Sequence, residues 1–145
     1  MSKFFVKAEH LPSITEFEMD ANQLGNMLNP LGLRELHLWD NRYFYCSLED
    51  WGKVLEKVLL NMPKYTTEKF DCENFAMLTS ARTSELFKFN TCGIAIGQSP
   101  WGYHGFNIFV SEADGAKLYY LEPQNSMIYD VTDDSGYKAE FVIFG

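Results

Sequence analysis

The sequence is poor in cysteine and in basic residues, and both shortages limit what the protein can be. Its 145 residues include 3 cysteines, an odd number without CxxC spacing, which argues against a disulfide framework and a zinc knuckle. Lys and Arg together number 12 against 20 Asp and Glu, giving a net charge of −8. This charge argues against binding to a nucleic-acid backbone or an anionic membrane, and it suits a divalent cation.

Long apolar runs and targeting segments are also missing. The first seven residues carry positive charge but no apolar h-region follows them, and no run is long enough to span a bilayer. The expectation is a soluble protein of a reducing cytoplasm, although a viral (for example phage) or non-classically released protein would look the same. A 145-residue chain with 46% hydrophobic residues is expected to form one domain, residues 1–145. The oligomeric state is not indicated.

Helix patterns fill roughly the first 90 residues and strand patterns the rest. Helices are predicted from Ser13 to Leu24 or Leu28, from Ser47 to Leu59, and from Asp71 to about Phe89; residues 3–8 are a possible edge strand and residues 36–46 a hairpin. Five strands are predicted at 93–97, 104–110, 117–122, 127–129 and 140–144. N-terminal helices (about 1–90) packed on a C-terminal antiparallel β-sheet (about 91–145) make an α+β fold.

The segment Lys69 to Ala76 joins the two parts and contains the residue of greatest chemical interest. Asp71 is a good N-cap, so Cys72 falls in the first helical turn. Unpaired N–H groups and the helix dipole favour a thiolate there, although a cysteine at a helix start is more often a small buried hydrophobic residue. Cys46 and Cys92 lie in or beside strands and are expected to be inert.

A histidine and a carboxylate can complete a site with Cys72. If residues 112–114 form the hairpin loop, His104 lies directly opposite Glu122 on the same face of the sheet. A carboxylate in this position fixes the histidine tautomer and stabilises the imidazolium. Asn107 is three residues from His104 and points to the other face. The predicted constellation is therefore Cys72, His104 and Glu122.

Three short motifs in this order resemble a known family. They are Asp71-Cys72-Glu73-Asn74-Phe75-Ala76, His104-Gly105-Phe106-Asn107 and Leu121-Glu122-Pro123-Gln124. Together they resemble papain-like cysteine peptidases of the fungal agglutinin C-terminal-domain type and their phage and bacterial relatives; the first motif is also similar to bacterial transglutaminase-like cysteine peptidases. The resemblance covers about residues 65–125, with Gly105 in place of the usual Ala and Asn74 in place of a frequent Asp.

The resemblance implies a papain-like fold and a cysteine hydrolase. Cys72 would be the nucleophile, His104 the general base and acid and Glu122 the orienting residue, cleaving an amide bond of a protein or peptide substrate through an acyl-enzyme. No cofactor is required for this chemistry, but Asp71 and Glu73 match positions associated with calcium dependence in the relatives, which makes them candidate metal ligands.

Several alternatives remain open at the level of sequence. Trp101 and Tyr103 either line a substrate cleft or belong to the core, and Gln124 either donates to an oxyanion or ends a strand. The same triad serves deamidases and transamidases. A different reading is a non-catalytic binding or structural module, encoded by a phage or bacterium, that keeps a papain-like fold.

Overall fold

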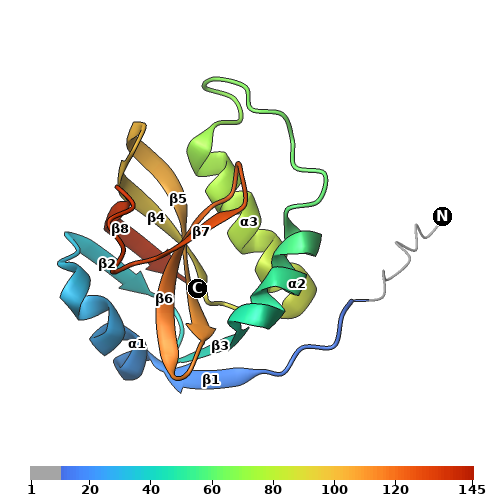
Figure 1. Ribbon diagram of the computed structural model, residues 1–145, viewed down its shortest axis with the longest axis vertical. Coiled ribbons are helices and arrows are strands. Elements are labelled where there is room, and N and C mark those ends of the chain that lie inside the picture. Colours follow the sequence, from blue (N-terminus) through green and yellow to red (C-terminus); the bar gives the residue numbers. More distant parts are fainter. Residues whose placement is uncertain (1–10) are drawn as a thin grey trace.

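The computed structural model describes residues 11–145 and has a mixed α+β fold (Figure 1). The edge strand predicted at residues 3–8 lies outside the described residues. Within residues 11–145, three α-helices and a short 3-10 helix (η1) accompany eight strands. In chain order the elements are β1 (Phe17–Asp20), α1 (Ala21–Leu28), η1 (Asn29–Leu31), β2 (Glu35–Leu38), β3 (Arg42–Ser47), α2 (Leu48–Val58), α3 (Cys72–Phe87), β4 (Cys92–Ser99), β5 (Gly102–Glu112), β6 (Ala116–Glu122), β7 (Met127–Asp130) and β8 (Lys138–Phe144).

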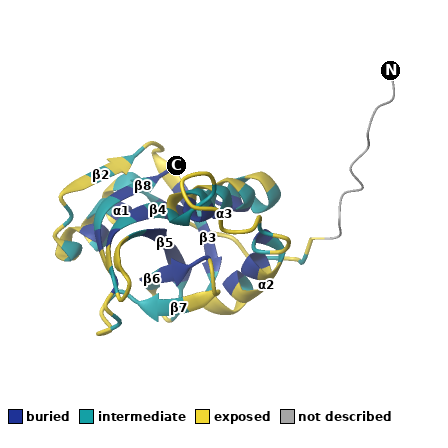
Figure 2. Ribbon diagram, turned by 90° about the horizontal axis from the view of Figure 1, so that it is seen from above, coloured by how far each residue is buried: buried dark blue, intermediate teal, exposed yellow. Residues whose placement is uncertain are grey.

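Strand β5 is the centre of a curled sheet. The strand order is β1-β3-β5-β4-β8-β2, and β6 pairs with β5 and carries β7. Along one edge of β5, β4 pairs with residues 102–109 and the end of β3 pairs with residues 111–112. β6 pairs with the other edge. Residues 105–111 of β5 are all buried, as Figure 2 shows. A strand covered on both faces carries apolar residues without alternation.

Two hydrophobic clusters hold the helices and the sheet together. One fills the inside of the curl with large side chains such as Tyr43, Phe106 and Phe144, and the other lies under α2 and includes Trp51 and Phe109. The indole N–H of Trp51 donates to the carbonyl of Val110 at 2.7 Å, which satisfies the polar group of a fully buried ring. α2 and α3 pack on one side of β5, and α1 covers the cluster inside the curl on the other side (Figure 1).

The structure confirms the strong local predictions. α2 begins after Ser47, whose hydroxyl accepts from the N–H of Asp50 at 3.1 Å. α3 begins at Cys72 as predicted, and all five strands predicted beyond residue 90 are present. The coarse α+β class is thus correct, whereas the papain-like packing implied by the resemblance is not confirmed.

The division into a helical and a sheet part is wrong. Residues 17–20, predicted as helix, form β1, and α1 starts only after Asp20, which makes reciprocal hydrogen bonds with Gln23 as its capping box. β2 and β3 do not form the predicted hairpin, since β2 pairs in parallel with β8 and β3 pairs with β1 and β5. The sheet is mixed rather than antiparallel, because β2 with β8 and β3 with β5 are parallel pairs between segments far apart in the sequence. Within residues 11–145, none of the helices combines the length and the apolar character needed to cross a membrane.

Candidate functional site

The head of α3 lies against the first half of β5. Asp71 has the extended conformation of an N-cap, and its N–H donates to Asn74 Oδ1 at 3.1 Å. A Cβ atom placed on Gly105 would lie 2.9 Å from the Cα of Glu73 and 3.0 Å from its nitrogen. Gly105, which departs from the family motif, is therefore needed for this close approach of helix and strand.

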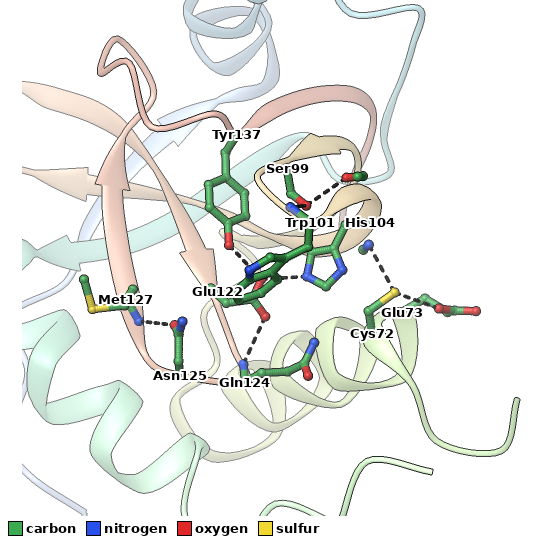
Figure 3. Close-up of polar contacts among 12 residues, drawn as sticks. Cys72, Glu73, Ser99, Trp101, His104, Glu122, Gln124, Asn125, Met127 and Tyr137 are labelled. Carbon is green, nitrogen blue, oxygen red and sulfur yellow. Dashed lines mark hydrogen bonds and ion pairs between the residues drawn. The ribbon is translucent and has the colours of Figure 1, made fainter. Parts of the chain in front are cut away.

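The sulfur of Cys72 is bonded to its neighbours on the helix and strand. Its thiol donates to Glu73 Oε2 at 3.2 Å and accepts from the N–H of Gly105 at 3.3 Å (Figure 3). Within the described chain no hydrogen bond joins Cys72 to His104. Burial raises the pKa of Cys72, and Glu73 raises it further, against a lowering by the Gly105 N–H. Desolvation and the neighbouring carboxylate thus act against the thiolate that the helix start favours, and the thiolate stays a prediction.

His104 is bonded to Glu122 instead. His104 Nε2 lies 2.7 Å from Glu122 Oε2, which confirms that the two side chains share a face. The predicted register is wrong by two residues: Asn107 pairs with Leu121, so the hairpin loop is residues 113–115 and His104 is a diagonal neighbour of Glu122. A shift of two residues preserves the face, and long side chains reach diagonal neighbours.

Glu122 is fully buried and receives three hydrogen bonds. Besides His104, the hydroxyl of Tyr137 donates to Oε2 at 3.2 Å and the N–H of Gln124 donates to Oε1 at 3.3 Å. Burial, followed by the nearby Glu122, raises the pKa of Tyr137. Sequence reasoning missed Tyr137, since it follows a turn-rich segment before β8 and carries no motif. Gln124 lies just beyond the end of β6 and donates its backbone N–H to Glu122; a side-chain contact with an oxyanion stays a prediction.

A hollow of about 240 Å³ opens at this place, lined by Cys72, Glu73, Ile96, Tyr103, His104 and Gly105. The indole of Trp101 packs edge-to-face on the imidazole of His104, with ring centroids 5.6 Å apart. Trp101 is 64% and Tyr103 57% exposed, so neither belongs to the core. Tyr103 lines the hollow, and Trp101 lies beside it against His104. A larger hollow of about 640 Å³ beside η1 and β7 contains none of the predicted site residues.

The two candidate metal ligands, Asp71 and Glu73, interact with each other. A hydrogen bond with Glu73 raises the pKa of Asp71, while the N–H of Glu73 itself and the thiol of Cys72 lower that of Glu73. Among residues 11–145, no three His, Cys, Asp or Glu side chains come together to hold a metal ion. Two carboxylates supply few of the about six to eight oxygen ligands that calcium takes, and calcium binding stays a prediction.

The site is thus an open hollow in a curled mixed sheet. It lies between the first turn of α3 and the β4–β5 hairpin.

Two solved structures are examples of similar folds. One, described as "PSL1a-E64 complex", is 25% identical over 88% of this chain and 51% of its own, with a TM-score of 0.66. The other is Polyporus squamosus lectin bound to the human-type influenza-binding epitope Neu5Acα2-6Galβ1-4GlcNAc, 25% identical over 88% of this chain and 49% of its own, with a TM-score of 0.64.

These similarities correct the functional prediction. The chain spans about half the length of the two structures it matches, and no family model or curated protein matches its sequence. Similarity to a lectin structure contradicts the identification as a cysteine peptidase, the Cys-His-Glu hydrolase and its protein substrate. The alternative of a non-catalytic binding module fits better.

Proposed function

We propose that this chain is a non-enzymatic sugar-binding module whose ligand site is the hollow at the head of α3. The fold similarity to a lectin over 88% of the chain is the observation that carries the proposal. Cys72 and His104 then serve as contacts in the wall of the site. Glu122 supports His104 from behind.

The chemistry of the hollow supports this use. Exposed aromatic rings such as Trp101 and Tyr103 offer flat apolar faces to the C–H side of a sugar ring, while polar groups at the base fix its orientation. Glu73 and His104 line the same hollow and supply hydrogen-bond acceptors and donors for hydroxyl groups. The raised pKa of Cys72 favours the neutral thiol, which suits a residue in the wall of a binding site better than a nucleophile.

Titration followed by ¹H–¹⁵N NMR tests the proposal. Addition of Galβ1-4GlcNAc or Neu5Acα2-6Galβ1-4GlcNAc is expected to shift the indole N–H of Trp101 and the amide of Gly105. Trp101→Ala should weaken binding at least about tenfold, which corresponds to about 1.4 kcal/mol.

The matched control is Trp39→Ala. The side chain of Trp39 is 70% exposed, and its backbone N–H donates to the carbonyl oxygen of Phe144. Trp39 therefore lies at the end of the β4–β8 pair away from the hollow. This variant should bind like the wild type. If neither sugar shifts any resonance, or both tryptophan variants bind like the wild type, the proposal is wrong.

A further inference from the structure

Strand β2 is an open edge of the curled sheet. It stands at the end of the strand order and, among the described residues, pairs with β8 alone; Figure 2 shows it at the outer margin of the molecule. The free edge of such a strand offers backbone N–H and C=O groups with which another strand can pair. Short length and charged side chains, which β2 has, generally protect an edge from pairing, so the arrangement of its charges matters.

The polar side chains of β2 are complementary and lie two residues apart. Glu35 and His37 share one face of the sheet, where their side chains are hydrogen-bonded to each other at 2.8 Å and are both about half exposed. Leu36 and Leu38 point to the other face and pack against the cluster inside the curl. Two β2 strands that run antiparallel and are centred on Leu36 therefore bring Glu35 of each copy opposite His37 of the other. Any other register that keeps the two faces apart loses these pairs.

An exposed tryptophan and an exposed arginine flank this edge. Trp39 follows β2 directly and is 70% exposed. Arg34 precedes β2, and its side chain, which forms an ion pair with Glu140 at 3.8 Å, is 71% exposed. In the same antiparallel pairing Trp39 of one copy lies beside Arg34 of the other, where the planar guanidinium can stack on the indole. Trp and Arg are among the residue types that most often supply the binding energy of protein interfaces.

We propose that two copies of this chain associate through β2, which pairs antiparallel with β2 of the second copy about a twofold axis at Leu36. Such an interface is isologous, because each copy offers the same strand to the other. It extends the sheet from one copy into the next by strand addition. The paired strands are short, so the contact is small, and small interfaces belong to weak and transient complexes. The inference does not rest on the proposed sugar-binding function.

Sedimentation velocity at pH 7 without added sugar tests the inference. The average mass should rise from that of the monomer at about 10 μM towards that of the dimer at about 1 mM, as expected for weak association. His37→Glu places a second carboxylate opposite Glu35 of the other copy and should raise the dissociation constant at least about tenfold. The double variant Glu35→His/His37→Glu again sets an acid opposite a histidine in each pair, and it should associate like the wild type.

The matched control is Thr67→Glu, which adds the same charge to the exposed loop between α2 and α3, away from β2 (Figure 1). It should leave the dissociation constant unchanged. ¹H–¹⁵N NMR of the wild type gives a second measurement that needs no substitution, because the amide resonances of residues 35–39 should shift as the protein concentration rises.

Three results would overturn the inference. They are a protein that stays monomeric at about 1 mM, concentration-dependent shifts confined to another surface, and a folded His37→Glu variant that associates as tightly as the wild type. A double variant that associates no better than His37→Glu would also overturn it, since the register about Leu36 would then be wrong. None of these results bears on sugar binding, so the proposed function stands or falls separately.

Discussion

At the scale of single residues, burial decides the chemistry of the site. Cys72 sits at a helix start, where a thiolate is expected, but the sulfur is partly buried and its hydrogen-bond partner is the carboxylate of Glu73. A donor at a helix terminus and an acceptor carboxylate act in opposite directions on a thiol. Burial first, and then the residue next to Cys72 in the sequence, therefore raise the pKa of its thiol.

Alkylation with iodoacetamide tests the state of the three thiols. Because its pKa is raised above 9.0, Cys72 should react slowly at pH 7 and faster only above about pH 9, as measured by mass spectrometry. Cys46 and Cys92, whose pKa values burial raises to about 12, should stay unlabelled until the protein unfolds. Fast labelling of Cys72 at pH 6 that His104→Ala abolishes would contradict this expectation.

Tyr137 is expected to stabilise the fold through its hydroxyl group. Tyr137→Phe removes one of the three donors to the buried Glu122 and should lower the free energy of unfolding by about 1–3 kcal/mol in urea denaturation. The control is Tyr129→Phe, which keeps the ring that stacks on Tyr137 with centroids 5.0 Å apart. Equal losses in both variants would show that the hydroxyl–carboxyl contact is unimportant.

At the scale of elements, the contact of α3 with β4 and β5 positions the site. The side-chain amide of the buried Asn107 donates to Ala76 on α3 at 2.9 Å and to Gly93 on β4 at 3.0 Å. It thus ties the helix to two strands, on the face away from His104 as the sequence predicted. Gly105 allows the same helix to approach β5 at its first turn, so Cys72 and Glu73 are brought next to His104.

Two glycine substitutions test this close approach. Gly105→Ala places a methyl group against the backbone of Glu73 and should lower the free energy of unfolding by about 1–3 kcal/mol. Gly52→Ala lies on the exposed side of α2 with nothing within 4 Å of the new Cβ, and it should raise that free energy by about 0.5–1 kcal/mol. Thermal melting of both variants beside the wild type gives the comparison. A stabilised Gly105→Ala variant would rule out the tight contact.

At the scale of the whole molecule, an acidic chain loses stability as its carboxylates become protonated. Hydrogen bonds from Thr132 lower the pKa of Asp130 in the folded protein. At a pH between the folded and the unfolded pKa of Asp130, the unfolded chain therefore binds more protons. The stabilisation from Asp130 is complete above its unfolded pKa near 3.8 and is lost as the pH falls through its folded pKa. The lowered pKa of Glu73 acts in the same direction.

The free energy of unfolding should therefore fall steadily from about pH 5 towards pH 2. Asp130→Asn should flatten this dependence, whereas Glu85→Gln, on the exposed surface of α3, should not. Urea denaturation at a series of pH values measures the slope. An unchanged slope in Asp130→Asn would contradict the assignment.

Most of the local structure could be predicted because it is encoded by nearby residues. α2 has a serine cap and a regular apolar face, and the segments beyond residue 90 are short, rich in β-branched and aromatic residues and bounded by turn residues. The shared face of His104 and Glu122 also follows from the hairpin between them, since a face depends on parity and tolerates an error of two residues. The parallel pairing of β2 with β8 joins residues about a hundred positions apart, which no local pattern encodes.

The amino-acid sequence by itself therefore determined the elements from α2 onward, their approximate limits and the face that His104 and Glu122 share. Tertiary structure decided which strands pair, that Tyr137 supports Glu122, that Glu73 rather than His104 bonds Cys72, and that Trp101 and Tyr103 stand at an open rim. The physical reason is that capping and periodicity act within a few residues along the chain. Burial, hydrogen-bond partners and charge are set by groups that only folding brings together.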